Sequence, residues 1–507
     1  SWENASAAIR TRNPYSDYGY YFLTQSDGEP LRVDESAFLN SFYPSADDYH
    51  SLHEVDNFSW YPGGRNLFEN TPINRGTKKS YTIDAPIADT GGSITVTLSA
   101  GTATRANISL NGKPLGEINV SIPSKYDKGN RADFFANIEQ FAAKNEVTIE
   151  VTQGGPARLD FISIATNKPR SAPNLYAATF PTPQYVHNIT TQNLHAHGAA
   201  DMVMVIPTSQ KLRQEAERLK AFHEKHDGMR VRIVPADELY NEFASGTPDA
   251  NAYRRYLKML YDRAENEADQ PKYLLLFGDC AWDNRMKTGD WRTTSVDDYL
   301  LCFESEDSFN EITCYVDDGF FTLLDDGEGT DLERSDLQDV AVGRFPVVHP
   351  NDARTMVDKT IAYAQNANAG AWQNTIMFMG DDGNDNLHMS DANKMADSLA
   401  TEHPQYLIKK VMWDMFKRES SATGHTYPEV TSIIKQQQGA GALVMNYVGH
   451  GRTDQISHES VLRLNDFKAF SNTNLPLWIT ASCDIMPFDG AVPTIGEAAV
   501  LNKNGGA

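Results

Sequence analysis

The pattern of apolar and polar positions divides the chain into two regions of different secondary structure. In the first region, residues 1–195, short segments alternate apolar and polar positions and are separated by Gly, Pro and Asn. Such alternation is typical of strands with one buried face. It predicts a β-rich N-terminal domain, a β-sandwich, with strands at residues 93–98, 147–151 and 159–164. The Pro-rich residues 169–197 are predicted to form a linker at its end.

From residue 201 onward, continuous apolar runs of strand length alternate with amphipathic segments of helix length. Apolar strands separated by such helices predict mainly parallel sheets that are covered on both faces. We therefore expect an α/β unit of two side-by-side subdomains, residues 196–370 and 371–507, the first of which contains an irregular acidic stretch at residues 280–339. Ser209 is expected to cap the first helix. Strands are predicted at residues 202–206, 230–235, 273–279, 340–344, 376–380, 407–411, 442–447 and 477–481, and helices at 209–226, 253–264, 352–367, 390–401 and 429–438.

Length and charge narrow the classes of function. A chain of 507 residues is too long for one ordinary core, so two or three domains are expected. The 45 basic and 68 acidic residues give a net charge of −23, which argues against a nucleic-acid partner and against direct binding to anionic lipid. No apolar run reaches the roughly 18 residues that span a bilayer. The first residues lack the pattern of a signal peptide, so they do not indicate a compartment.

The four cysteines are too few and too scattered for a disulfide framework. Because none forms a Cys-x-x-Cys pair, neither a zinc site nor another cofactor is expected, although a bridge between Cys302 and Cys314 is compatible with their spacing in an oxidising compartment. Cys483 lies far from the other three. An isolated cysteine with a suitable histidine elsewhere in the chain is the pattern of a catalytic nucleophile.

Three predicted strands are followed by side chains of types that act as acids, bases or nucleophiles. Sites in open α/β sheets lie beyond the carboxyl ends of the strands. Asp381 and Asp382 follow one such strand, His450 follows another between two glycines, and Cys483 follows a third. Each has a plainer interpretation as well: a solvated turn for the aspartates, a hydrogen-bonded turn for the histidine, and a small buried side chain for the cysteine.

Cys483 and His450 are more informative together than apart. One helix-bearing connection separates them, and a right-handed parallel connection places both strand ends at the same edge of a sheet. A thiol and an imidazole at one edge supply the nucleophile and the general base of a cysteine peptidase. We predict that the two side chains lie about 3 to 6 Å apart. Asp381 or Asp382 is expected to orient the imidazole, as the third member of a triad does.

The order and wording of these motifs resemble the gingipain family of caspase-related cysteine peptidases. The resemblance covers about residues 200–507 and implies a caspase-like α/β fold. It implies that Cys483 is the nucleophile and His450 the base. The backbone N–H groups of Gly451 and Cys483 would then form the oxyanion hole, and Asp382 fits the third position best, with the adjacent Asp381 left open. The matching segments are Asn446–Gly451, Ala481–Asp484, Ile495–Ala498, Phe277–Asp279 and Val342–Pro346.

Further segments, Tyr20–Thr24, Trp60–Phe68 and Phe320–Gly329, resemble the gingipain-like sortases of the type IX secretion system. Those sortases remove C-terminal secretion signals from cargo proteins and join the new C-terminus to a lipopolysaccharide amine. The resemblance thus implies cargo proteins as substrates, an outer-membrane β-barrel partner, and a location at the bacterial outer-membrane surface or in the periplasm. The alternatives are a secreted gingipain-like endopeptidase and a non-catalytic cell-surface scaffold.

Three features of the sequence stay open beside this resemblance. The family's fold continues beyond Gly506, so the chain is expected to be part of a longer protein. Asp391 is a candidate for the acidic specificity residue of Arg-cleaving gingipains, but an aspartate at a predicted helix start is also a common cap. The acidic residues 317–328 carry enough oxygen ligands for calcium, but they lack the spacing of an EF-hand loop, and a solvated loop is the competing interpretation.

Overall fold

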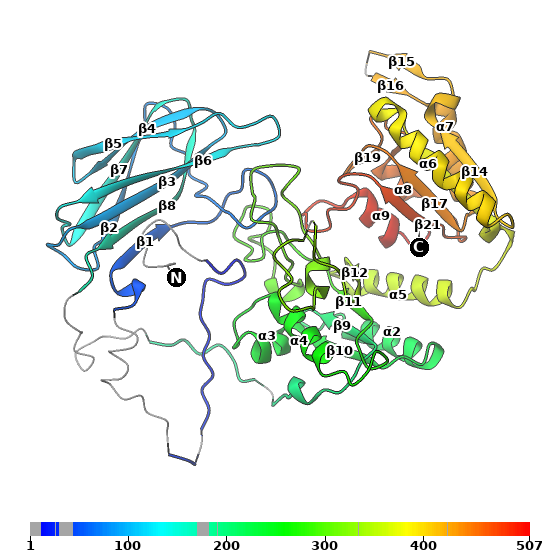
Figure 1. Cartoon of the computed structure of the whole chain (residues 1–507), viewed down its shortest axis with the longest axis horizontal. Helices are drawn as coiled ribbons and strands as arrows, with labels where there is room; N and C mark the ends of the chain where they lie inside the picture. The colour runs from blue at the N-terminus through cyan, green and yellow to red at the C-terminus, as the bar shows by residue number, and fades with distance from the viewer. Residues whose placement is uncertain are drawn as a thin grey trace.

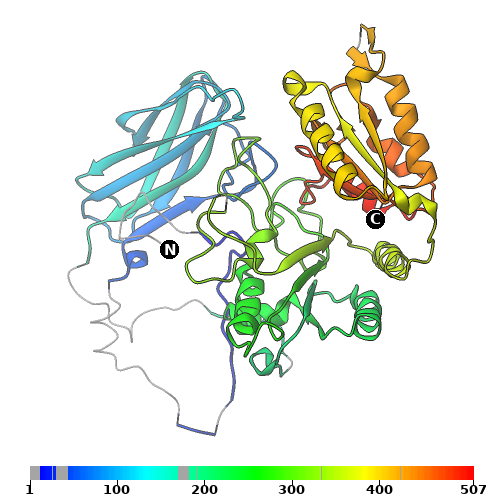
Figure 2. The same ribbon diagram turned by 45° about the vertical axis from the view of Figure 1, so that its right-hand side comes forward.

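The computed structural model describes residues 12–25, 27–29, 44–169, 182–189, 191–332, 334–422 and 424–506. Figure 1 shows three parts: an all-β part, a first α/β part below it, and a second α/β part that contains the last residues. Figure 2 shows the same three parts from a second direction. Within the described residues, no helix is both long enough and apolar enough to cross a membrane.

The N-terminal part is a sandwich of two antiparallel sheets, as the alternating pattern predicts. In the described residues the sheets have the strand orders β1-β8-β3-β6 and β2-β7-β4-β5. Their inward side chains, such as Val96 and Ile149, form one apolar core between the sheets. Part of the predicted linker at 169–197, residues 170–181 and 190, lies outside the described residues. The strands are β1 (His50–Glu54), β2 (Lys78–Asp84), β3 (Gly92–Ala100), β4 (Thr104–Leu110), β5 (Lys113–Val120), β6 (Asn130–Ile138), β7 (Lys144–Gln153) and β8 (Ala157–Thr166).

The first α/β part contains a parallel sheet of order β10-β9-β11-β12 in the described chain. The predicted cap at Ser209 is wrong, because α2 begins only at Arg213 after Leu212. Ser209 lies in the preceding turn instead, where its N–H donates to the Asp297 carbonyl at 2.8 Å. Helix α3 was not predicted. The elements are β9 (Met202–Ile206), α2 (Arg213–His226), β10 (Val231–Pro235), α3 (Ala236–Phe243), α4 (Asn251–Asp262), β11 (Tyr273–Phe277), β12 (Ala341–Phe345) and α5 (Pro350–Ala364).

The second α/β part contains a parallel sheet of order β14-β13-β17-β21 among the described residues. Helix α6 begins at Gly383 rather than at the predicted Ser390, and its residues 384–386 have left-handed backbone angles. Short antiparallel pairs lie beside the sheet: β15 with β16, and β18 with β19 and β20. The elements are β13 (Thr375–Gly380), α6 (Gly383–Glu402), β14 (Leu407–Met412), β15 (Glu419–Ser421), β16 (Gly424–Thr426), α7 (Pro428–Ala440), β17 (Val444–Val448), β18 (Gly451–Arg452), β19 (Gln455–Ile456), β20 (Leu462–Arg463), α8 (Leu464–Ala469), β21 (Leu477–Ala481) and α9 (Ile495–Leu501).

Helix α5 connects the two α/β parts and packs on the last helix, α9. The buried Lys359 of α5 donates to the carbonyl oxygens of Val500 at 2.6 Å and Asn502 at 3.1 Å. A cation at the C-terminal end of a helix satisfies its free carbonyl groups and complements the helix dipole. Burial lowers the pKa of Lys359 to about 8. The predicted boundaries, at 195/196 and 370/371, fall between β8 and β9 and between α5 and β13, and they stay predictions.

The irregular residues 280–339 join all three parts, and Figures 1 and 2 both show them as loops between the sandwich and the sheets. Arg285 forms a buried ion pair with Asp56 of the sandwich at 2.7 Å. The Gly64 N–H of the sandwich donates to the Glu304 carboxylate at 3.1 Å. On the other side, the Trp282 N–H donates to the carbonyl of Asp489, six residues after Cys483. This stretch is therefore a structural junction and not a free loop.

Two buried acids, Glu304 in this junction and Asp489 beside it, predict how stability depends on pH. Burial, followed by the negative charge of Asp489, raises the pKa of Glu304. Burial raises the pKa of Asp489 to about 6, and the negative charge of Glu497 adds to this. The folded chain then binds more protons than the unfolded chain between pH ~4 and pH ~6, so this stabilisation is complete below pH ~4 and is lost as the pH rises through about 6.

We expect the melting temperature of the protein to fall between pH 5 and pH 8, with a contribution from Asp489 of about 1 kcal/mol over that interval. The Asp489→Asn variant carries a neutral side chain at every pH, so its melting curve should change less over the same interval. Differential scanning calorimetry at several pH values measures both proteins. An equal fall in the two would contradict the role given to Asp489.

Candidate active site

Three strands were predicted to be followed by candidate catalytic side chains. These strands, β13, β17 and β21, are neighbours in the second α/β sheet. In the parallel register, Gly380 of β13 pairs with Val448 of β17, and Val448 pairs with Ala481 of β21. The ladder continues one residue further, because the Gly449 N–H donates to the Ala481 carbonyl at 3.2 Å. The segments that carry Asp381, His450 and Cys483 therefore leave the sheet at the same edge.

Gly451 allows the histidine segment and the cysteine segment to approach each other closely. A methyl group at this position would lie 2.4 Å from Ser482 Oγ, 2.5 Å from Ile485 Cδ1 and 2.9 Å from the backbone oxygen of Cys483. No side chain larger than hydrogen fits there without movement. Cys483 itself is a free, exposed thiol, and Asp484 after it has a left-handed backbone (φ 47°) that turns the chain sharply. The predicted separation of 3 to 6 Å between thiol and imidazole stays a prediction.

Asp381 is the buried anchor of this edge, with 1% of its surface exposed. Its carboxylate accepts the backbone N–H of His450 at 2.6 Å and the Tyr447 hydroxyl at 3.0 Å. It also accepts the Gly383 N–H at 3.2 Å and the Nδ1–H of His388 at 2.5 Å. Asp381 thus fixes the position of the His450 backbone, whereas its hydrogen bond to an imidazole goes to His388.

Asp382 has other partners at the same edge. Its carboxylate accepts the Tyr427 hydroxyl at 2.8 Å and lies 3.6 Å from the Arg418 guanidinium. In the part of the chain that the structure describes, the hydrogen bonds of Asp382 do not include the His450 ring. The assignment of Asp382 as third catalytic residue therefore stays a prediction, and the geometry gives it no direct support.

Two further histidines surround the His450 ring. The His388 ring meets it edge to face, with 4.9 Å between the ring centroids and an interplanar angle of 80°. The His458 ring stacks on it at 4.4 Å with an angle of 23°. Neither residue was predicted from the sequence. His388 lies in the part of α6 that was assigned to a loop, and His458 lies in an irregular segment without a motif, so no sequence signal pointed to either.

This geometry agrees with what comparison with known proteins finds. A model of peptidase family C25 matches residues 195–507, which is more than half of the chain. The chain belongs to peptidase family C25. Among curated proteins, none matches. The family assignment confirms the predicted gingipain-like catalytic fold and makes the chain a member of a family of cysteine peptidases.

Solved structures are similar in fold. The crystal structure of dimeric latent PorU from Porphyromonas gingivalis is 24% identical, with a TM-score of 0.52 over 64% of this chain and 39% of that chain. The Arg-specific cysteine proteinase gingipain R is 16% identical, with a TM-score of 0.43 over 62% of this chain and 63% of that chain. The chain thus spans less than two thirds of either protein. The likeness to PorU supports the caspase-like α/β fold.

The other three cysteines of this C25 chain do not resemble nucleophiles. Cys280 and Cys302 are fully buried, and burial raises the pKa of Cys280 to about 11 and that of Cys302 well above its usual range. The suggested bridge between Cys302 and Cys314 is wrong, since both are free thiols. Cys302 Sγ instead lies 3.2 Å from the Glu304 carboxylate. Because the thiolate is the reactive form, Cys483 is the cysteine best placed to react.

The acidic residues at 317–328 are engaged by the protein itself. Asp318 forms a bidentate pair with Arg344, at 2.6 and 2.7 Å, and Glu328 accepts the Leu337 N–H at 3.0 Å. Among the described residues, no group of three or more His, Cys, Asp or Glu side chains is arranged to hold a metal ion. Asp391 is half-buried within α6 and not at its start, and it pairs with Lys394 at 3.1 Å.

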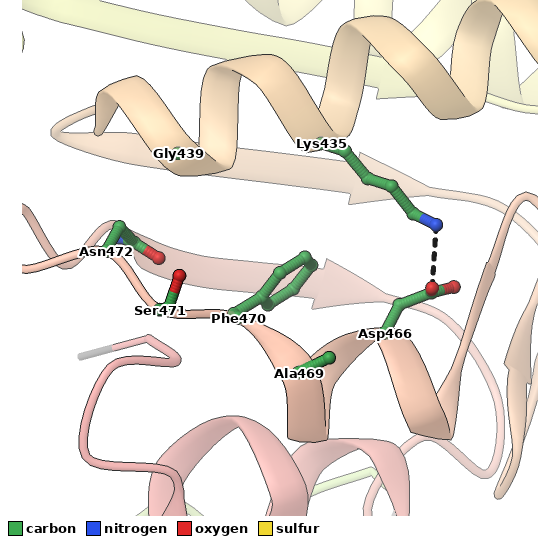
Figure 3. Close-up of a pocket in the computed structure, with 7 residues that line it drawn as sticks. All are labelled: Lys435, Gly439, Asp466, Ala469, Phe470, Ser471 and Asn472. Atoms are coloured by element: carbon green, nitrogen blue, oxygen red, sulfur yellow. Dashed lines mark ion pairs between the residues drawn. The ribbon is translucent and has the colours of Figure 1, made fainter.

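A pocket of about 370 Å³ lies at the other end of the same sheet (Figure 3). Gly439 and Asn472, which line it, precede β17 and β21, whereas His450 and Cys483 follow these strands. Its charged side chains, Lys435 and Asp466, form an ion pair at 2.7 Å. The pocket is thus separate from the candidate active site.

Proposed function

We propose that this chain is a cysteine transpeptidase that removes the C-terminal secretion signal of type IX cargo proteins and transfers the new C-terminus to a lipopolysaccharide amine. The observation that carries the enzymatic part is the placement of an exposed thiol, Cys483, and an imidazole, His450, at one edge of the C25 sheet. The sortase part is supported by the resemblance of residues 20–24, 60–68 and 320–329 to type IX sortases. The cargo, a β-barrel partner and an outer-membrane location belong to the same proposal.

The proposed reaction is acyl transfer in two steps. In the first, the Cys483 thiolate adds to the carbonyl carbon of the cargo, and the N–H groups of Gly451 and Cys483 stabilise the oxyanion. The C–N bond then breaks, and the imidazolium of His450 protonates the leaving amine, which carries the signal peptide away. In the second step, neutral His450 takes a proton from the acceptor amine as it attacks the thioester, and the thiolate is released.

The alternative endopeptidase differs only in the acceptor, because water would take the acyl group from Cys483. The two functions are distinguished by supplying a full-length cargo protein together with a primary amine such as glycinamide. We expect mass spectrometry to find cargo whose new C-terminus carries the amine, while the reaction without amine yields the free carboxylate. Cut cargo with a free carboxylate at saturating amine would indicate the endopeptidase, and uncut cargo would favour the non-catalytic scaffold.

A further inference from the structure

We propose that His388, held by the carboxylate of Asp381, is a positioning residue for the general base His450. The proposal rests on the proposed function in one respect, namely that His450 acts on Cys483. It assigns a role to a residue that no sequence motif indicates. It also changes the role of the aspartate, because Asp381 would act on the base through a second imidazole and through the backbone.

The first support is that His388 has a fixed orientation. Its Nδ1–H donates to Asp381 at 2.5 Å, and its Nε2 accepts the side-chain N–H of Asn384 at 3.1 Å. Because both ring nitrogens are hydrogen-bonded, the ring is held in one orientation. The side chain of His388 is 15% exposed and that of Asp381 is 2% exposed. A ring with both nitrogens bonded and little solvent around it cannot rotate freely.

The second support is that one carboxylate anchors both the second ring and the backbone of the base. Asp381 Oδ1 accepts from His388, while Oδ2 accepts from the His450 N–H and from the Tyr447 hydroxyl. The carbonyl oxygen of His450 accepts the Ser457 N–H at 2.8 Å and lies 2.7 Å from the Tyr447 hydroxyl, whose single proton goes to this oxygen or to Asp381. The backbone of His450 is therefore held at both its N–H and its carbonyl, and His388 is held by the same carboxylate.

The third support is that the His450 ring is closely packed where it faces the start of α6. A methyl group on Gly383 would lie 2.6 Å from Cδ2 and 2.7 Å from Nε2 of His450, so the ring lies directly against the start of α6. His388 contacts the His450 ring edge to face on a second side, and His458 stacks on it on a third side. Edge-to-face contacts between aromatic rings are favourable and fix their relative orientation. Removal of the His388 ring frees one side of the His450 ring and lets His450 turn away from the Cys483 thiol.

The test measures the pairing of His450 with Cys483 without any substrate. The rate of Cys483 alkylation by iodoacetamide is recorded against pH for the wild type and for the His450→Ala, His388→Ala and His388→Asn variants. We expect the His388→Ala profile to move toward the His450→Ala profile, and kcat toward a peptide substrate to fall about 10- to 100-fold with little change in KM. The Asn variant keeps a donor to Asp381 but lacks the ring, so it controls for the loss of the Asp381 bond.

His425→Ala serves as the matched control, because His425 is an exposed histidine of the same α/β part. A His388→Ala protein that is folded by circular dichroism and has the wild-type alkylation profile and wild-type kcat would overturn the proposal. If the His388→Ala variant does not fold, a folded His388→Asn variant with the wild-type alkylation profile and wild-type kcat would overturn the proposal. If His450 does not act on Cys483, as the proposed function requires, the wild type and the His450→Ala variant will show the same alkylation profile. That result differs from the one that overturns the role of His388 alone.

Discussion

Replacement of Cys483 by Ala is expected to abolish both cleavage and amine attachment, by at least about 10⁴-fold in kcat/KM. The reason is structural as well as chemical. Cys483 is the exposed thiol at the strand edge, and the other three cysteines of the described residues lie in the junction, at 280, 302 and 314. Without it no thioester forms, so neither water nor an amine receives the acyl group. The measurement is the rate of release of the signal peptide from a cargo protein, followed by mass spectrometry.

The controls for this prediction come from the same chain. Cys314→Ala removes a partly buried thiol in the junction, and Cys280→Ala and Cys302→Ala remove fully buried ones. These three substitutions should affect stability, by about 1–3 kcal/mol for small buried side chains, and leave the chemical step intact. Normal maturation of cargo by the Cys483→Ala protein would show that the chain is neither a sortase nor a peptidase of this mechanism.

The sheets were largely predictable because their strands are short, continuous and apolar. Residues 202–206 and 477–481 were placed with the observed bounds, since an apolar run between polar turns leaves a buried strand few alternatives. The parallel connection rule then brought His450 and Cys483 to one edge from sequence alone. The prediction therefore rested on the local apolar pattern of each strand and on the right-handed rule for parallel connections.

The details of the site were less predictable, because they depend on contacts between segments. Helix α6 is bounded at Gly383, but its residues 384–386 have left-handed backbone angles, so its right-handed turns begin only after Asn386, closer to the predicted Ser390. The sequence pattern gives no sign of this left-handed turn. That turn brings His388 to Asp381, and Asp391 lies inside the helix. Similarly, the choice between Asp381 and Asp382 depends on which carboxylate faces the interior, and adjacent residues in a turn give no signal for this. Burial separates them: Asp381 anchors the His450 segment, and Asp382 bonds to Tyr427.

Replacement of Gly451 by Ala should test whether the close approach of the two catalytic segments is required. Ala has no backbone difficulty there, because Gly451 is not among the glycines with positive φ. The added methyl group meets Ser482, Ile485 and the backbone of Cys483 at less than 3 Å, so the two strand ends must separate. A displacement of about 1 Å between nucleophile and base costs on the order of 10²-fold in rate, and overpacking costs about 1–3 kcal/mol of stability.

The matched control for Gly451→Ala is Gly439→Ala, in α7 of the same α/β part, where a methyl group would meet nothing within 4 Å. Ala is favoured over Gly in a helix by roughly 0.5–1 kcal/mol, so this variant should be slightly stabilised and fully active. Peptide cleavage rates and melting temperatures of both variants give the comparison. Because the two substitutions add the same methyl group, a selective loss of kcat/KM in Gly451→Ala isolates the contact at the strand ends. Equal activity in the two variants would mean that the segments of His450 and Cys483 tolerate separation, and that their approach is not what sets the rate.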